Sequence, residues 1–484
     1  MDALTPALWD DDKLKAALEA SRTSLLKEGL VTAEVRVDRL RRAIALVYDN
    51  GDRLVEAMAD DFGHRTSQTS WLADIAGSLK SLKVAQKNLS KWMKDRKQPV
   101  QFPLGLMGVR GKVSYQPKGV VGIIGPWNYP VSMIFQPLAG ALAAGNRVML
   151  KPSEHTPRTS ALIAELIESS FAPEEITVVT GGPDISAKFS QLPLDHIFFT
   201  GATSIGKIIM GEAAKNLTPV TLELGGKSPV IVGQSAPLSN AAEKLAVTKL
   251  MNAGQTCVAP DYVMIDEGRQ ETFVKNYSES VAAMYPKLLN NDEYTSVVNR
   301  RHYDRLNGYL DDARDKGADV RVINPAGEDF SGQNKTNKMP PVVVLNVSDD
   351  MKLMQEEIFG PILPVRTTAT VDDAIDYVNK GEKPLALYYF GADKRESLKV
   401  RHNTSSGAFG VNESMFHVAQ ETLPFGGVGA SGMGNYHGEW GFKTFSHERS
   451  VFATGPKFSI AKLAGLLPPY GKMTDMTIKQ EVRK

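Results

Sequence analysis

Two kinds of hydrophobic patterning divide the chain near position 118. Before it, residues 10–95 carry leucines at helical spacing, with Leu14, Leu18 and Leu25 in one stripe and a second stripe from Leu40, and charged residues lie between them. No alternating β pattern occurs in this part. It predicts three helices that form a packing layer and contribute nothing to a functional site.

After position 118, short β-branched runs alternate with segments of helical length. The predicted strands are 120–124, 148–150, 176–179, 197–199 and 220–224, and the segments between them include 161–169 and 204–215. Strand, crossover helix and strand in repetition is typical of a doubly wound, Rossmann-like parallel sheet, so the fold class is α/β. Ligands bind at the carboxyl ends of the strands in such sheets.

A second α/β section is predicted from 228 to about 411, with helices at 241–251, 271–285 and 374–380. The chain is glycine-rich from 425 onward and ends in a tail. A length of 484 residues is too long for one core and agrees with two to four domains.

Charge and composition exclude several classes of protein. The net charge of +1 provides no basic field for nucleic acid or an anionic membrane. The longest apolar stretch, 131–144, falls short of the ~20 residues that span a bilayer and is interrupted by Gln136 and Pro137. The N-terminus, with acidic residues at 10–12, lacks an export signal. Together with a single cysteine, this predicts a cytoplasmic location.

That cysteine, Cys257, is the candidate nucleophile. A lone cysteine forms no internal disulfide or four-thiolate metal site, which leaves reactivity or an inert place in the core. It ends the segment Gly-Gln-Thr-Cys at 254–257, and Glu223 opens Glu-Leu-Gly-Gly-Lys at 223–227 upstream. A carboxylate at a glycine-flanked strand end suits a general base.

Three other strand ends carry polar or glycine-rich segments. Residues 201–206, Gly-Ala-Thr-Ser-Ile-Gly, open a helix whose N–H groups suit a pyrophosphate, although the spacing also fits an ordinary tight turn. Glu154 could accept hydrogen bonds from a ribose, which favours NAD, or belong to a helix cap. Asn128, between Pro126 and Pro130, could donate to an oxyanion or serve as loop structure.

The eight histidines show no metal-ligand spacing, so no metal site is predicted. A cysteine–histidine hydrolase stays an alternative, because such dyads are spatial rather than sequential.

Seven motifs, in order, resemble those of the aldehyde dehydrogenase superfamily, and the resemblance covers nearly the whole chain. They are Pro-Trp-Asn-Tyr-Pro at 126–130, Lys-Pro-Ser-Glu at 151–154, Phe-Thr-Gly-Ala-Thr-Ser-Ile-Gly-Lys at 199–207, Glu-Leu-Gly-Gly-Lys-Ser-Pro at 223–229, Gly-Gln-Thr-Cys at 254–257, Glu-Glu-Ile-Phe-Gly-Pro at 356–361 and Pro-Phe-Gly-Gly-Val-Gly at 424–429. The short N-terminus and segments 257–262 and 445–451 resemble the class 3 branch. Within it, the chain looks most like bacterial coniferyl aldehyde dehydrogenases.

The resemblance implies NAD(P)-dependent oxidation of an aldehyde to its acid. Cys257 would form a thiohemiacetal and then a thioester, and Glu223 would activate the hydrolytic water. The side-chain amide of Asn128 and the N–H of Cys257 would hold the oxyanion. Two rival readings are a coenzyme A-acylating relative, which can dispense with Glu223, and a non-catalytic relative.

The resemblance also implies a cofactor site for NAD, with NADP possible. Its residues would be Trp127, Lys151, Glu154, Gly201, Gly206, Leu224, Glu357 and Phe359. Lys151 and Glu154 would hold the adenosine ribose, and Gly201 and Gly206 would frame the pyrophosphate turn. Position 202 is Ala where many relatives carry a hydroxyl residue, so the pyrophosphate contacts stay open.

The implied domains are 1–101 and 118–224 for the cofactor and 225–411 for catalysis. An oligomerisation extension would comprise 102–117 and 442–455, followed by a tail at 456–484, and it would form a homodimer. Trp127, Tyr129 and Phe416 are candidates to line an apolar substrate tunnel. The expected substrate is an aromatic aldehyde such as coniferyl aldehyde, and medium- or long-chain alkanals are the alternative.

Overall fold

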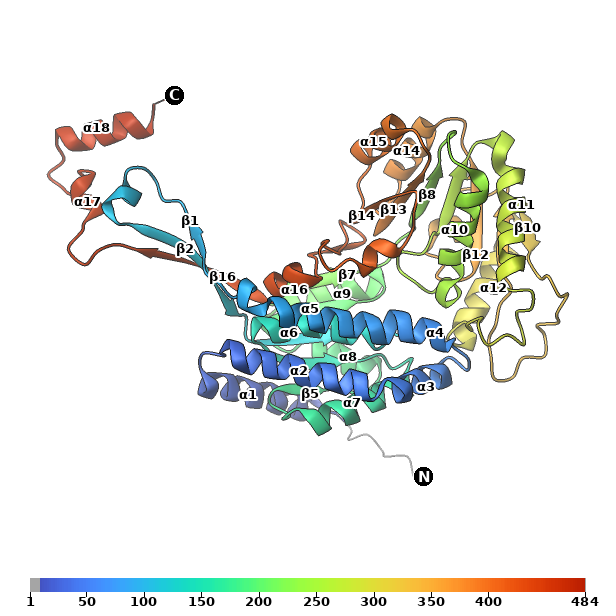
Figure 1. Cartoon of the computed structure of the whole chain (residues 1–484), viewed down its shortest axis with the longest axis horizontal. Helices are drawn as coiled ribbons and strands as arrows, with labels where there is room; N and C mark the ends of the chain where they lie inside the picture. The colour runs from blue at the N-terminus through green and yellow to red at the C-terminus, as the bar shows by residue number, and fades with distance from the viewer. Residues whose placement is uncertain (1–8, 484) are drawn as a thin grey trace. The chain divides into compact units, whose positions relative to one another are not determined.

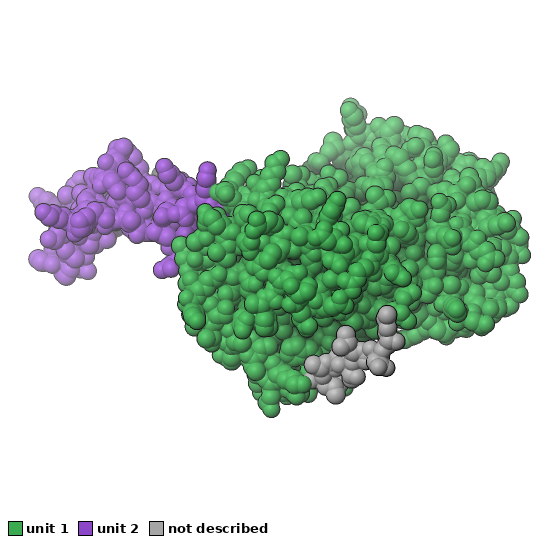
Figure 2. Space-filling view, turned by 60° about the horizontal axis from the view of Figure 1, so that its bottom comes forward, with its two compact units in different colours: residues 1–92, 117–446 green, residues 93–116, 447–484 purple. Residues whose placement is uncertain are grey.

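The computed structural model describes residues 9–483 and divides into two compact units (Figure 2). The main unit comprises residues 1–92 and 117–446, and the small unit comprises residues 93–116 and 447–484. Residues 1–4, on which the prediction of no export signal partly rests, lie outside the described residues.

A six-stranded sheet contains the five strands that the sequence predicts between 120 and 224 and a sixth, β15, that it does not predict. Its order is β15-β7-β6-β3-β4-β5, and the last five strands run parallel. The bounds are β3 Val120–Ile124, β4 Arg147–Lys151, β5 Ile176–Val178, β6 His196–Thr200, β7 Val220–Glu223 and β15 Gly432–Met433. The observed α/β architecture confirms the predicted fold class.

The strand order indicates where a ligand would bind. From β3 the chain adds β4 and β5 on one side and then β6 and β7 on the other. The loops that follow β3 and β6 therefore diverge, and such a switch point is where doubly wound sheets bind ligands. Segment 126–130 lies in the first of these loops, and segment 201–206 comprises the second loop and the first turn of α9.

The N-terminal helices are more numerous than the three predicted. They are α1 Asp11–Glu28, α2 Ala33–Asp49, α3 Gly51–Asp61, α4 Ser67–Thr69, a π-helical segment η1 Ser70–Ile75, and α5 Ala76–Trp92. The leucine spacing does not predict the break at Asn50 or the π-helical turn. Such turns occur often at functional sites.

The other helices of the main unit follow or connect strands. They are α6 Ser132–Ala144, α7 Pro157–Ser170, α8 Pro183–Ser190, α9 Thr203–Ala214, α10 Leu238–Leu250, α11 Glu267–Met284, α12 Arg300–Asp315, α13 Lys352–Gln355, α14 Val371–Lys380, α15 Lys394–Asn403 and α16 Gly438–Thr444, with 3-10 turns η3 Met251–Gly254 and η4 Phe416–Ala419.

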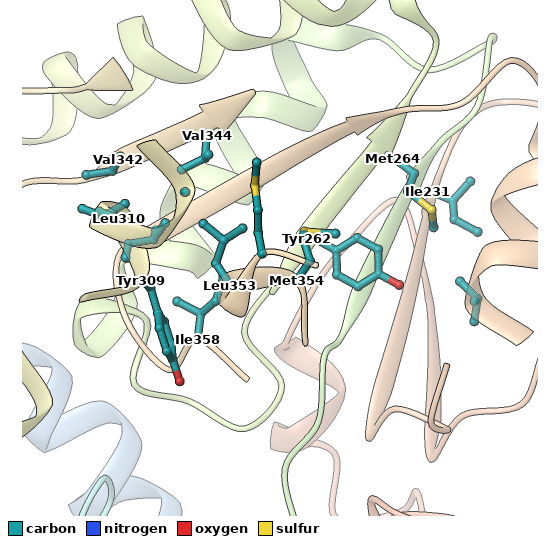
Figure 3. Packing of buried hydrophobic residues seen from close by; sticks show 14 of the residues in the cluster. Ile231, Tyr262, Met264, Tyr309, Leu310, Val342, Val344, Leu353, Met354 and Ile358 are labelled. Carbon is teal, nitrogen blue, oxygen red and sulfur yellow. The ribbon is translucent and has the colours of Figure 1, made fainter. Parts of the chain in front are cut away.

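A seven-stranded sheet forms from the second α/β section, in the order β10-β11-β12-β9-β8-β13-β14. Its strands are β8 Pro229–Val232, β9 Tyr262–Ile265, β10 Asp319–Val322, β11 Val342–Leu345, β12 Ile362–Thr367, β13 Ala386–Phe390 and β14 Ala408–Val411. Helices α10 and α11 lie on one side of this sheet and α14 and α15 on the other (Figure 1). Buried side chains on one face, including Val342 and Val344, pack against Leu310 and Leu353 (Figure 3).

The small unit contains a three-stranded sheet of β1 Arg96–Gln98, β2 Arg110–Pro117 and β16 Ser446–Ala453, followed by α17 Ile460–Leu463 and α18 Lys472–Glu481. A 3-10 turn, η2 Leu104–Met107, lies between β1 and β2. The structure thus starts this unit before the predicted extension at 102–117, and residues 442–444 belong to α16. Within residues 9–483, no helix is long and apolar enough to cross a membrane.

Candidate active site

A cavity of about 360 Å³ in the main unit gathers most of the predicted site residues. Thr200 and Glu223 of the six-stranded sheet line it, together with loop residues of both α/β sections, and its volume is in the range of ligand pockets. The predicted residues in its lining are Trp127, Asn128, Gly201, Glu223, Leu224, Cys257, Glu357 and Phe359. Lys151, Glu154 and Gly206 lie elsewhere and are described below.

A left-handed turn presents Cys257 to the cavity. Asn252, Ala253 and Gly254 have φ values of 52°, 53° and 76°. A Cβ on Gly254 would lie 2.3 Å from the carbonyl oxygen of Gly360, so only glycine fits there. The turn ends η3 and leaves the side chain of Cys257 half-buried at the cavity wall.

Hydrogen bonds lock Asn128 to this turn. Its side-chain Nδ2 donates to the carbonyl of Gln255 at 3.1 Å, and its own carbonyl accepts from Asn252 Nδ2 at 3.0 Å. Gln255 in turn donates to the carbonyl of Ser296 at 3.0 Å. One amide hydrogen of Asn128 is left for a ligand, which suits the oxyanion donor implied by the resemblance.

Tyr129 connects the same turn to a buried ion pair. Its hydroxyl lies 2.8 Å from Thr256 Oγ1, and the guanidinium of Arg65 lies 5.1 Å from the centre of its ring. Asp74 pairs with Arg65 at 2.8 Å and accepts the N–H groups of Val131 and Ser132 at 3.1 and 3.0 Å. These last bonds anchor the start of α6, directly after Tyr129.

The prediction that the N-terminal helices contribute no site is therefore wrong. Leu72, Ala73 and Gly77 line the cavity, and Asp74 supports its wall. Leucine spacing reports only which face of a helix is buried. It cannot show that residues of the π-helical segment η1 line a cavity.

Glu223 ends β7 and is buried without partners. Only 3 % of it is exposed, and neither carboxylate oxygen has a hydrogen-bond partner among the described residues. Burial raises the pKa of this carboxyl well above its ordinary value. Once ionised, a carboxylate with a raised pKa is a stronger base than an ordinary one, as a general base requires.

Cys257 is a weakly acidic thiol in this environment. Burial raises its pKa to about 12, with contributions from the charges of Glu357 and Glu223. Its own N–H and that of Val258 favour the thiolate, but they do not outweigh the first two causes. A cationic ring bound between the thiol and Glu357 would reverse part of this shift, since an opposite charge favours the ionised form.

Glu357 lies close to Gly225. A Cβ on Gly225 would meet the carboxylate at 2.1 Å, so glycine is required for this approach. Burial, together with the charge of Asp261, raises the pKa of Glu357 to about 8. The loop that carries it is held by Lys227, which pairs with Asp261 and donates to the carbonyl of Glu356 at 3.0 Å. Sequence reasoning assigned no role to Lys227 or Asp261.

The start of α9 fits a pyrophosphate. Ala202 is its N-cap residue and makes no side-chain capping bond. The N–H groups of Ile205 and Gly206 bond the Ala202 carbonyl, which leaves those of Thr203 and Ser204 for a ligand. Gly206 lies in the first turn of α9, where a Cβ would be 2.7 Å from Leu224, so it contributes through packing and not through the cavity lining.

Lys151, the last residue of β4, and Glu154 lie together and fit a ribose. The ammonium of Lys151 is buried, donates to the carbonyl of Pro152 at 2.8 Å and lies 3.6 Å from the carboxylate of the exposed Glu154. A hydrogen-bond donor and an acceptor side by side match the two hydroxyls of a ribose.

Aromatic side chains form one wall of the cavity, but the predicted Phe416 is not among them. The ring of Trp127 lies 5.3 Å from that of Phe359 and 5.0 Å from that of His302. Phe416, predicted to line the tunnel, is 49 % exposed and is not a lining residue. It begins the turn η4, and Met415, whose φ is 64°, points into the cavity instead. Among residues 9–483 there is no cluster of three or more metal-ligating side chains.

Comparison with known proteins agrees with this geometry. Residues 4–451 match the aldehyde dehydrogenase family. A coniferyl aldehyde dehydrogenase of a Pseudomonas species is 49 % identical over 461 residues, which are 95 % of this chain and 94 % of that protein. Rat aldehyde dehydrogenase family 3 member B1 is 38 % identical over 464 residues, 95 % and 94 % of the two chains.

A solved structure is also similar over nearly the whole chain. Staphylococcus aureus AldH, in a substrate-bound state, superposes with a TM-score of 0.89 at 35 % identity, covering 97 % of this chain and 99 % of that one.

Proposed function

The chain belongs to the aldehyde dehydrogenase family and oxidises an aldehyde with NAD(P), and we propose that its substrate is an aromatic aldehyde such as coniferyl aldehyde. The observation that carries the proposed chemistry is the convergence of Cys257, Asn128 and Glu223 on one cavity. We further propose that residues 1–101 and 118–224 bind the cofactor and 225–411 supply the nucleophile.

Cys257 carries the substrate through the reaction in this proposal. Its thiolate, formed once the thiol has released its proton to solvent, attacks the aldehyde carbon and the carbonyl electron pair moves to oxygen, where Asn128 and the N–H of Cys257 donate hydrogen bonds. When bound, NAD(P) supplies the acceptor for the hydride that leaves this carbon. The product on Cys257 is a thioester.

Glu223 acts in the second half of the reaction. Its carboxylate removes a proton from a water molecule that attacks the thioester carbon, and the thiolate of Cys257 leaves as the acid forms. A carboxyl with no hydrogen-bond partner has both oxygens available for that water. A coenzyme A-acylating enzyme has no need of this base.

Support for an aromatic substrate comes from the relatives and from the lining. A relative that shares 49 % identity is a coniferyl aldehyde dehydrogenase. The cavity wall carries Trp127, Tyr129, Phe425 and Tyr436, which suit a planar ring. Its aliphatic members, such as Met133, also suit an alkanal, which is the competing substrate class.

NAD is the proposed cofactor. The carboxylate of Glu154 beside Lys151 favours a ribose with a free 2′-hydroxyl and repels a 2′-phosphate. A cytoplasmic location is proposed from the single cysteine.

A homodimer is proposed through the small unit. This unit exposes many large apolar side chains, including Phe102, Leu106, Phe452, Leu467, Tyr470 and Met476. Such exposure marks interaction surfaces. Light scattering should give twice the mass of one chain, and the mass of a single chain would contradict the dimer.

The test of function is formation of reduced nicotinamide, followed by absorbance, with coniferyl aldehyde, benzaldehyde and straight-chain aldehydes. We expect the highest kcat/KM for coniferyl aldehyde and loss of all turnover in Cys257→Ser. Higher kcat/KM for the alkanals would keep the chemistry and remove the aromatic assignment. Turnover in Cys257→Ser would contradict the mechanism.

A further inference from the structure

Side chains hold the residues on both sides of Cys257. On the upstream side, the hydroxyl of Tyr129 lies 2.8 Å from Thr256 Oγ1. On the downstream side, the hydroxyl of Tyr388 donates to the carbonyl oxygen of Val258 at 2.7 Å. The proposed chemistry uses the thiol and the N–H of Cys257, and it leaves the hydroxyl of Tyr388 without a role.

Tyr388 lies behind the cavity wall and not in it. Its exposed fraction is 0 %, and it is not among the residues that line the cavity. It belongs to β13, whose backbone pairs with β8 on one side and β14 on the other. A Cβ on Gly410 of β14 would lie 2.7 Å from Cδ1 of Tyr388, so the ring packs against a position without a side chain. A rigid sheet therefore fixes the place of this hydroxyl.

The hydroxyl of Tyr388 also joins the nucleophile turn to a second part of the cavity wall. It accepts the N–H of Met415 at 3.2 Å while it donates to Val258. Met415 lines the cavity with a φ of 64°, and both Met415 and Val258 are buried. Loss of the hydroxyl would take this partner from a buried N–H and a buried carbonyl, which is unfavourable, and both backbone segments would shift.

The backbone of Val258 bears directly on the thiol. Its N–H is one of two that stabilise the thiolate of Cys257, and the other is the N–H of Cys257 itself. Burial raises the pKa of Tyr388, and the charge of the thiolate adds to this effect, which agrees with a hydroxyl close to the sulfur. A carbonyl of Val258 that is held by Tyr388 keeps the adjoining N–H in place at the sulfur.

We propose that Tyr388 is a positioning residue of the reaction, whose hydroxyl holds the backbone after Cys257 so that the thiolate and its N–H donors keep the geometry for attack on an aldehyde. This inference rests on the proposed function and adds to it a residue that does not contact the substrate. Displacement of a reacting group by about 1 Å can lower a rate by a factor of about 10², so the contribution of one anchoring hydroxyl is measurable.

The test is Tyr388→Phe in the full chain, because this change removes the hydroxyl and keeps the packing of the ring. One measurement is the rate of the first turnover, followed as NADH formation at saturating coniferyl aldehyde or hexanal. The other is the rate at which iodoacetamide alkylates Cys257 at pH 9 without cofactor or aldehyde. Both rates should fall at least about fivefold, and the first should fall by the same factor for the two aldehydes.

Tyr389 is the matched control. It follows Tyr388 on β13, and successive side chains of a strand point to opposite faces of the sheet. Its exposed fraction is also 0 %, and its hydroxyl donates to Glu396 Oε2. Tyr389→Phe therefore measures what loss of a hydroxyl from a buried tyrosine does to folding alone, and it should leave both rates unchanged.

Three results would overturn the inference. They are an unchanged value of either rate in Tyr388→Phe, equal losses in Tyr389→Phe, and a loss of turnover confined to one aldehyde, which would indicate a role in substrate choice. Absence of NADH formation with every aldehyde in the wild type would instead overturn the proposed function, while the alkylation rates would still test Tyr388.

Discussion

The side-chain nitrogen of Asn128 lies 3.1 Å from the carbonyl oxygen of Gln255, two residues before Cys257. The bond joins the loop after β3 to the turn that carries the thiol. The amide that we propose as oxyanion donor is therefore fixed relative to the nucleophile before any substrate binds, and such pre-organisation is what makes an oxyanion site effective.

Asn128→Ala should lower kcat by a factor of about 10²–10³, as loss of one oxyanion donor does. The measurement is steady-state oxidation of coniferyl aldehyde. Asn216 also donates to a backbone carbonyl, that of Gln191, but it lies on the surface. Asn216→Ala is therefore the control and should leave kcat unchanged. A normal kcat in Asn128→Ala would contradict the assigned role.

Glu223→Gln should separate the two halves of the reaction. Hydride transfer does not need this base, whereas hydrolysis of the thioester does. We expect one equivalent of NADH per site in a rapid burst, followed by a steady state at least about 100-fold slower than that of the wild type. Loss of the burst itself would place Glu223 in the first half.

The same variant should change the dependence of stability on pH. The raised pKa means that Glu223 ionises at a higher pH in the folded protein than in the unfolded chain, where it ionises near 4.5. As pH rises above 4.5, the unfolded state releases its proton first and the wild type loses stability. The melting temperature of Glu223→Gln minus that of the wild type should therefore increase from pH 5 to pH 8. A difference that shrinks over this range would contradict the raised pKa.

Alkylation of Cys257 reports the acidity of the thiol, because it is the only cysteine in the chain. With a pKa of about 12, the rate with iodoacetamide in the absence of cofactor should keep rising to pH 10. Glu357→Gln removes a neighbouring carboxylate and should make the reaction faster at pH 9. A rate that levels off near pH 8.5 would show an ordinary thiol.

Glu154→Gln should shift the cofactor preference toward NADP. Removing the carboxylate removes the repulsion of a 2′-phosphate, which is about 1 kcal/mol or more for charges ~4 Å apart. The ratio of kcat/KM for NADP to that for NAD should rise at least about fivefold. Glu168→Gln, at an exposed position of α7, is the control and should keep the wild-type ratio.

Asp74→Asn should destabilise the main unit. The side chains of Arg65 and Asp74 are fully buried, so the variant leaves an uncompensated guanidinium, which typically costs about 3–5 kcal/mol. Denaturant unfolding gives the value. Asp60 pairs with Arg158 at the surface, and Asp60→Asn should change the free energy of unfolding by less than about 1 kcal/mol. Equal changes in the free energy of unfolding for the two variants would mean that breaking the buried pair costs no more than breaking the surface pair.

The sequence by itself determined the parallel sheet and the family. Strands buried on both faces appear as continuous β-branched runs, such as Val120–Ile124, and the seven motifs lie at strand ends where the fold binds ligands. Local patterns of this kind need no knowledge of distant contacts.

Only the tertiary structure decided which distant residues complete the site. Leu72 and Gly77 lie in helices whose spacing predicted packing alone, and His437 also lines the cavity although no predicted motif includes it. Met415 and Phe416 are adjacent in sequence, but Met415 is buried and Phe416 is half-exposed. The positive φ of Met415 sets the two side chains in different directions, and a hydrophobic pattern does not report backbone angles. Burial of Glu223 and Cys257 likewise depends on the whole fold, because desolvation is a property of every element packed around a charge.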